Sequence, residues 1–216
     1  MLTTMATRRF LVVEDEPLVA ERVFIPLVSP FGEVVLARDG TAAIAIIDAE
    51  PVEFTAVITD ICVPGRSGLD VLAHAKARWS EILVLLVTGQ DPHNVANAAF
   101  DFRADFIEKP VEGARVRRFL MDAISRADRI AFPRRLVAVV EVRRGKHALS
   151  EAETDILKRG ASAESREKIA KARGVSSETI NKQIASLLRK TRNTSFRALI
   201  DDILQEAARI PPNTQR

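Results

Sequence analysis

Short apolar runs alternate with amphipathic stretches over residues 1–130. Runs of strand length predict buried strands at 9–13, 33–37, 55–59, 82–87 and 104–108. Apolar residues at helical spacing predict helices at 17–29, 41–49, 68–79, 92–101 and 112–130. Pro26 lies inside the first helical pattern, where it should kink or shorten the helix. Strands that alternate with helices in this way predict a doubly wound, five-stranded parallel sheet covered on both faces.

The second half of the chain has a wholly helical pattern from Leu149 onward. Between the halves, residues 125–148 have the composition of a connector, and Pro133 should end the helix that precedes it. The segment "RRLVAVVEVRRG", closed by Gly145, is expected to form a short helix, although its valines also suit a strand. We therefore expect three parts: an α/β domain, a linker and an all-α domain, at 1–128, 129–147 and 148–210.

Serines mark the starts of helices in the second half. Ser150 precedes "EAE", and Glu153 three residues further on completes a capping box. Ser165 precedes a short helix that Gly174 ends, and the serines that follow cap a longer helix. A short helix, a tight glycine turn and a longer helix form the helix-turn-helix pattern.

Charge divides the chain in the same place. Residues 1–128 carry 13 Lys and Arg against 19 Asp and Glu, a net charge of −6. Residues 129–216 carry 19 against 10, a net charge of +9. An acidic half joined to a basic half suggests two roles, with a polyanion such as nucleic acid as the partner of the basic one. The alternative is a basic surface that only aids solubility.

The cysteine content fits a reducing compartment. Cys62 is its single cysteine, which excludes an internal disulfide. The densest apolar run, "ILVLLV", has the length of a strand and not of a membrane span, and "MLTTMATRRF" lacks the apolar segment of a secretion signal. We expect a cytoplasmic protein with no membrane contact.

Polar side chains follow four of the predicted strands. They are Glu14 with Asp15, Asp60, Thr88 and Lys109. Because the carboxyl ends of parallel strands meet at one edge of a sheet, where ligands of such sheets bind, these side chains should converge. Taken alone, the acidic pair could simply cap the helix that starts at Pro17.

Three gathered carboxylates are costly unless a cation neutralises them, and oxygen ligands of this kind suit Mg²⁺. A carboxylate such as Asp60 can also attack phosphorus and form an aspartyl phosphate. Lys109 would then supply a positive charge for the phosphoryl oxygens, and Thr88 a hydroxyl donor.

The motifs "LVVEDEPLV", "VITDICVPGRSGLDVL", "LLVTG" and "ADFIEKP" resemble, in order and spacing, the receiver domain of two-component response regulators. The resemblance covers residues 8–128 and implies a flavodoxin-like fold. It implies that Asp60 is the phosphoacceptor, charged by a sensor histidine kinase. The family's Mg²⁺ ligands correspond to Asp15, Glu14 through water, Asp60 and the backbone carbonyl of Cys62.

The same resemblance implies a switch. Thr88 would move toward the phosphoryl group, Lys109 would pair with it, and Phe106 would be the aromatic residue that follows Thr88. The bond between Lys109 and Pro110 is cis in the family. Among the departures from the family pattern, Arg103 stands where a glycine is frequent.

The basic half resembles the tetrahelical DNA-binding domain of the LuxR/FixJ type over 148–208, through "LSEAETDIL", "IAKARGVSSETI" and "SLLRK". The recognition helix would then run from Ser177 to Lys190. Side chains expected to approach bases or phosphates of double-stranded DNA are Thr179, Asn181, Lys182, Ala185, Arg189, Lys190 and Arg192. Departures are Arg159 and Gly160, where leucines are usual, and Ala163, where a glycine is usual.

These patterns predict a transcriptional response regulator and not an enzyme beyond assisting its own phosphotransfer and autodephosphorylation. Phosphorylation should repack the face near Phe106 and so change homodimerisation or free the basic domain for DNA. The alternatives are a phosphorylation-independent regulator, a C-terminal domain that binds protein, and a phosphatase-type enzyme. The absence of a general acid at a suitable spacing disfavours the phosphatase.

Overall fold

The computed structural model describes residues 8–89 and 99–210, and the chain divides into two compact units. One unit comprises Met1–Asp128 with Asn213–Arg216, and the other comprises Arg129–Pro212. Most of the helix predicted at 92–101 lies outside the described residues. Within the described ranges, none of the helices has the length and apolarity needed to cross a membrane.

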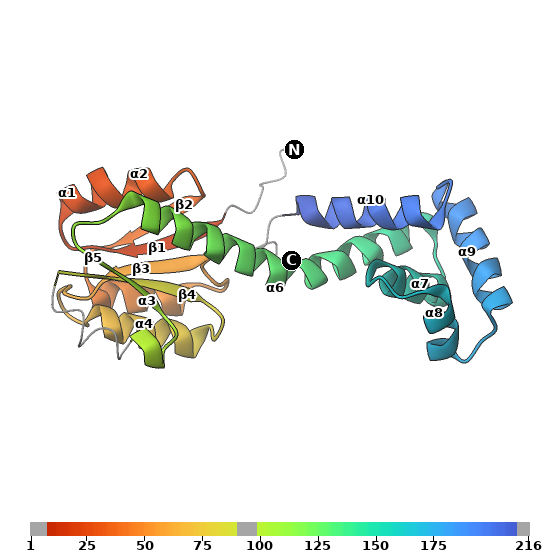
Figure 1. The fold of residues 1–216 in the computed structure, drawn as a ribbon, viewed down its shortest axis with the longest axis horizontal. Helices are drawn as coiled ribbons and strands as arrows, with labels where there is room; N and C mark the ends of the chain where they lie inside the picture. Colours follow the sequence, from red (N-terminus) through yellow and green to blue (C-terminus); the bar gives the residue numbers. More distant parts are fainter. Residues whose placement is uncertain (1–7, 90–98, 211–216) are drawn as a thin grey trace. The chain divides into compact units, whose positions relative to one another are not determined.

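A parallel five-stranded sheet forms the centre of the first unit, as predicted (Figure 1). Its strands are β1 (Arg9–Val13), β2 (Glu33–Ala37), β3 (Ala56–Asp60), β4 (Leu83–Thr88) and β5 (Asp105–Glu108). Their order is β2-β1-β3-β4-β5, so the connections change direction between β1 and β3. Val13 lies opposite Ala37 on one side and Thr59 on the other, which aligns the carboxyl ends of the central strands. Ligands of such sheets bind at this switch point.

Helices cover both faces of the sheet (Figure 1). They are α1 (Pro17–Val19), α2 (Ile25–Val28), α3 (Gly40–Ala49), α4 (Gly68–Arg78) and the first part of α6 (Gly113–His147). Leu11 and Val13 face a core with α3 and α4, whereas Phe10 and Val12 face a core with Phe24 and α6. Successive residues of β1 face opposite cores because side chains alternate between the two faces of a strand. Since both faces of the sheet are buried, the strands appear in the sequence as continuous apolar runs.

The first helical segment accommodates Pro26 through a local change of helix type. A π-helical turn at Ala20–Phe24 separates α1 from α2, and the backbone N–H of Ile25 donates to the carbonyl of Ala20. Proline has no N–H to continue an α-helical ladder, and widened turns are a common cause of helix bending. The segment stays helical to Val28, one residue short of the predicted end.

The prediction that Pro133 ends the preceding helix is wrong. Helix α6 runs without interruption from Gly113 to His147, past both Pro133 and Gly145. Leu136, Val139 and Val140 are buried in the core of the second unit, together with residues of the following helices. The burial of these side chains outweighs the single backbone hydrogen bond that proline removes. Residues 129–147, expected as a linker, therefore form a helix of the second unit that buries one face in its core.

Four further helices complete the second unit: α7 (Glu151–Ala161), α8 (Arg166–Arg173), α9 (Ser177–Thr191) and α10 (Phe196–Arg209). Each begins after a serine whose side chain accepts a backbone N–H three residues on; these serines are 150, 165, 176 and 195. The predicted capping box of Ser150 and Glu153 is present in both directions. Gly174 ends α8 with a φ of 64°, the left-handed conformation that favours glycine.

Three departures from the family patterns can be explained by the structure. Arg103 and Ala163, which stand where glycine is common, both have positive φ, 50° and 60°. Gly160, where leucine is usual, lies against α10: a Cβ there would be 2.6 Å from Cζ of Phe196 and 3.0 Å from Cδ1 of Ile200. The missing side chain allows α7 and α10 to approach closely.

Two helical glycines should therefore respond oppositely to alanine. Gly160→Ala should lower the free energy of unfolding by about 1–3 kcal/mol, because Phe196 must move out of its core position. Gly145→Ala, with nothing within 4 Å of the added Cβ, should raise it by up to about 1 kcal/mol through helix propensity. Urea unfolding followed by far-UV circular dichroism measures both values. Equal effects of the two substitutions would contradict the close approach at Gly160.

Candidate functional site

Three carboxylates meet at the carboxyl edge of the sheet, beyond β1 and at the end of β3. One oxygen from each of Glu14, Asp15 and Asp60 lies within 4.8 Å of the other two. Glu14 and Asp60 are buried, whereas Asp15 is exposed. The parallel register of β1 and β3 produces this clustering, because it brings the ends of the two adjacent strands to the same level.

Lys109 completes the cluster from the end of β5. Its Nζ lies 2.5 Å from Oδ2 of Asp60 and 3.7 Å from Oε2 of Glu14. Burial alone would lower the pKa of Lys109, but the hydrogen bond with Asp60 and the nearby negative charges raise it overall. The ammonium is therefore firmly charged. The peptide bond between Lys109 and Pro110 is cis, as the family resemblance implied.

The residues of this cluster fit a divalent cation. Burial raises the pKa of Glu14, with Lys109 opposing the rise. Oε2 of Glu14 is buried without a hydrogen-bond partner, so one carboxylate oxygen in the cluster lacks the donor that buried polar atoms normally have. A set of carboxylate oxygens with one exposed member suits Mg²⁺, which takes oxygen ligands and keeps several waters. Glu14, Asp15 and Asp60 could hold such an ion.

The loop after β3 supports Asp60 through its backbone. The N–H of Cys62 donates to Oδ1 of Asp60 at 2.9 Å, while Lys109 holds Oδ2. Each carboxylate oxygen of Asp60 thus has a hydrogen-bond partner, and together the two bonds fix the orientation of the carboxylate. The Cys62 side chain is exposed.

Thr88 and Phe106 lie on neighbouring strands beside the cluster. Thr88 is the buried last residue of β4, and its carbonyl accepts the backbone N–H of Lys109 at 2.8 Å. Phe106, in β5, is half-buried and lies opposite Leu86 of β4. It packs against the core on the α3 and α4 side. A movement of the Thr88 backbone would therefore shift the backbone of Lys109.

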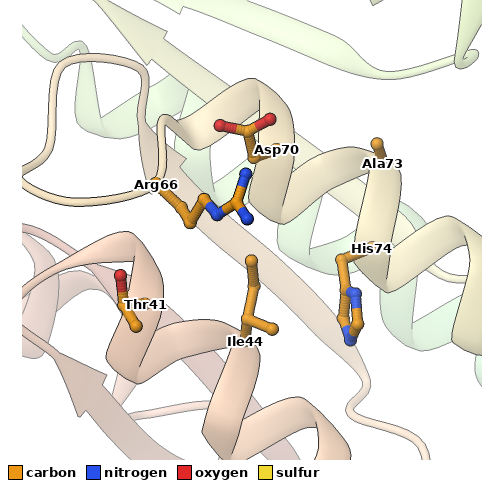
Figure 2. Close-up of a pocket in the computed structure, with 6 residues that line it drawn as sticks. All are labelled: Thr41, Ile44, Arg66, Asp70, Ala73 and His74. Carbon is orange, nitrogen blue, oxygen red and sulfur yellow. The ribbon is translucent and has the colours of Figure 1, made fainter.

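A groove on the same unit lies between α3 and α4 (Figure 2). It is lined by Thr41, Ile44, Arg66, Asp70, Ala73 and His74. His74 contacts Asp48 at 2.8 Å, and Asp70 belongs to the capping box of Ser67. The groove shares no residue with the acidic cluster: Asp70 serves the cap of α4, and His74 joins α4 to α3.

In the second unit, α9 has one buried face and one exposed face. Ile180, Ile184 and Leu187 are buried. The side chains predicted to approach DNA that are exposed in the structure are Asn181, Lys182, Ala185, Arg189, Lys190 and Arg192. Thr179 is half-buried and bonds Ser176 at the start of the helix. Apart from Thr179, the side chains predicted to approach DNA therefore lie away from the buried face of the helix.

Lys190 has partners within its own unit. Its Nζ donates to Oε2 of Glu153 at 2.7 Å and to the carbonyl of Ala148 at 3.1 Å. Burial would raise the pKa of Glu153, but the hydrogen bonds from Lys190, Ser150 and Ser186 lower it to about 2. This ion pair joins the end of α9 to the start of α7, an arrangement that no local motif signals.

Two arginines on α8 also contact α9. Arg166 donates to Oδ1 of Asn181 at 3.3 Å, and Arg173 donates to Oε1 of Gln183 at 2.7 Å. The sequence analysis did not single out either arginine. These two hydrogen bonds depend on how α8 and α9 cross. The sequence of α8 alone indicates a basic helix but not which side chains its arginines contact.

Residues 10–120 match the family model described as the response regulator receiver domain, so the chain belongs to that family. The chain is 28% identical over 158 residues to the transcriptional regulatory protein FixJ of Bradyrhizobium diazoefficiens, covering 72% of this chain and 76% of that protein. It is 27% identical over 191 residues to FixJ of Azorhizobium caulinodans, covering 88% of each. A solved receiver domain protein from Clostridium thermocellum is 27% identical, with a TM-score of 0.52 over 56% of this chain and 98% of that one.

The fold and the comparisons thus define the class: a two-component response regulator. The similarity to the two FixJ proteins, which are transcriptional regulatory proteins, extends beyond the receiver domain.

The ion pair of Glu153 with Lys190 predicts a pH-dependent stability. The pKa of Glu153 is about 2 in the folded chain and about 4.3 when unfolded. A lowered pKa means that its ionised form stabilises the fold above about pH 4.3, and that this stabilisation is lost as the pH falls toward 2. Glu153→Gln should therefore cost about 2 kcal/mol at pH 7 and about half as much at pH 3.

Urea unfolding at pH 7 and pH 3 measures this difference. Glu151→Gln, at an exposed position in the same helical turn, is the matched control and should change little at either pH. A cost of Glu153→Gln that stays the same at both pH values would contradict the assignment.

Proposed function

We propose that this protein accepts a phosphoryl group on Asp60 from a sensor histidine kinase, with Mg²⁺, and that this event controls DNA binding by the second unit. The observation that carries the proposal is the arrangement of Asp60 between Lys109 and two further carboxylates. Phosphoryl transfer to a carboxylate requires a nucleophile with positive charge close by. Here the ammonium of Lys109 and a possible metal site would supply that charge beside Asp60.

The transfer would proceed by attack of an Asp60 carboxylate oxygen on phosphorus. A new oxygen–phosphorus bond forms, the nitrogen–phosphorus bond of the kinase's phosphohistidine breaks, and the electron pair returns to the imidazole. A bound Mg²⁺ would neutralise charge on the phosphoryl oxygens. Lys109, which now pairs with Asp60, would turn its positive charge to a phosphoryl oxygen, and the Thr88 hydroxyl would donate to another.

Conformational change would follow from the position of Thr88 and Phe106. The new phosphoryl group adds charge and acceptor oxygens next to β4 and β5. Recruitment of Thr88 would free space for Phe106, which is half-buried and so able to change its packing. The repacked face around β5 would then promote homodimerisation.

DNA binding is proposed for the second unit. Helix α8, the turn at Gly174 and α9 have the order of a helix-turn-helix, with α9 as the recognition helix. The unit is basic, and α9 presents Lys182 and Arg189 on its exposed face. The relatives named as transcriptional regulatory proteins support this role.

Phosphorylation should require Asp60. Incubation with acetyl phosphate and Mg²⁺ should add one phosphoryl group to the wild type, because the nucleophile and its neighbouring cation are already in place. Asp60→Asn should abolish the addition, and a chelator should abolish it in the wild type. Asp122→Asn, at an exposed position on α6, is the control and should react normally. Intact-protein mass spectrometry measures the outcome, and a fully phosphorylated Asp60→Asn variant would refute the acceptor assignment.

DNA affinity should fall steeply with salt, because phosphate contacts release counterions. Arg189→Ala should weaken binding to all sequences and reduce the slope of log affinity against log salt by about 1. Arg118→Ala, exposed on the first unit, serves as the control. Fluorescence anisotropy at several salt concentrations measures the slopes. Binding of the wild type that does not vary with salt would argue against a DNA interface.

A further inference from the structure

The exposed face of α9 carries an ion pair at its beginning. Oε1 of Glu178 lies 2.8 Å from Nζ of Lys182, one helical turn away, and both side chains are 77% exposed. Asn181 and Ala185 are exposed on the same face, whereas Ile180 and Ile184 point into the core. The pair therefore lies on the surface that the proposed function directs at DNA.

Fold stability gives an acid at this place only a small role: Glu178 lies in the first turn of α9, where a carboxylate contributes about 0.3–1 kcal/mol. General attraction to DNA does not favour an acid here. An exposed pair of this kind contributes about 0.3–0.5 kcal/mol to stability. A carboxylate on a surface that meets phosphates also opposes their binding. A carboxylate can only accept hydrogen bonds, and in the major groove the donors on base edges are the amino groups of cytosine and adenine. Glu178 is thus suited to read a base and unsuited to contact the backbone.

We propose that Glu178 and Lys182 together read one G·C base pair. The carboxylate would accept from N4 of cytosine, and the ammonium would donate to O6 and N7 of guanine. A G·C pair presents this donor beside these acceptors, which matches the adjacent carboxylate and ammonium. In an A·T pair the amino group separates N7 from O4, so the ammonium would reach a single acceptor. This inference depends on the proposed DNA-binding function.

The experiment begins by selecting duplexes from a random library with the wild-type protein. Binding is then measured, by fluorescence anisotropy, to duplexes that carry each of the four base pairs at every selected position. The wild type should prefer G·C at one position of the half-site by at least about fivefold. Glu178→Ala and Lys182→Ala should each lose the preference at that same position and keep the preferences elsewhere.

Matched controls break an equivalent pair on another helix. Arg197 and Asp201 form an exposed pair with the same spacing on α10. Arg197→Ala and Asp201→Ala should leave every base preference unchanged. Circular dichroism confirms that all four variants are folded, which is expected because both pairs lie on the surface.

Three results would overturn the inference, and they are distinguishable. If Glu178→Ala binds every duplex more tightly and selects the same sites, Glu178 only repels phosphates. If the two α9 variants lose preference at different positions, they do not read one base pair. If the wild type binds no duplex at all, the proposed DNA-binding function fails, and this inference fails with it.

Discussion

Repulsion among carboxylates at one edge of a parallel sheet is the constraint around which the first unit is organised. Glu14 is fully buried and Asp60 almost so, and buried carboxylates need a positive partner. Lys109 supplies that partner from a third strand. In the proposed function, a phosphoryl group that arrives at Asp60 would meet the charge of Lys109 and that of a bound cation, and it would rearrange both.

The second unit depends on close contacts between helices. Gly160 lets α10 approach α7, while Leu136, Val139 and Val140 of α6 fill the same core as Leu199 and Ile203 of α10. Arg143 of α6 bonds Glu206 of α10. The pair of Glu153 and Lys190 joins the end of α9 to the start of α7. This pair holds α9 against α7, while the inward side chains of α9 maintain the fold and its outward ones stay exposed.

Helix capping connects the chemistry of single residues to this arrangement. Ser150 caps α7 and shares Glu153 with Lys190, so one carboxylate satisfies a backbone N–H and an ammonium. Its pKa falls to about 2 because these donors favour the ionised form more than burial disfavours it. A local capping motif has thereby become part of a contact between helices that are distant in sequence.

Most of the architecture could be read from local pattern, because strand and helix periodicities and capping serines depend on neighbouring residues. The five strands, the capping box at Ser150 and the convergence of Glu14, Asp15, Asp60 and Lys109 at one edge belong to this group, the last because parallel strands align their carboxyl ends. The path of α6 through Pro133 was beyond such reasoning, since proline ends isolated helices and only burial of Leu136, Val139 and Val140 compensates. The pairing of Lys190 with Glu153, and of Arg166 with Asn181, likewise arose when the helices packed, because the crossing of two helices determines which charged side chains meet.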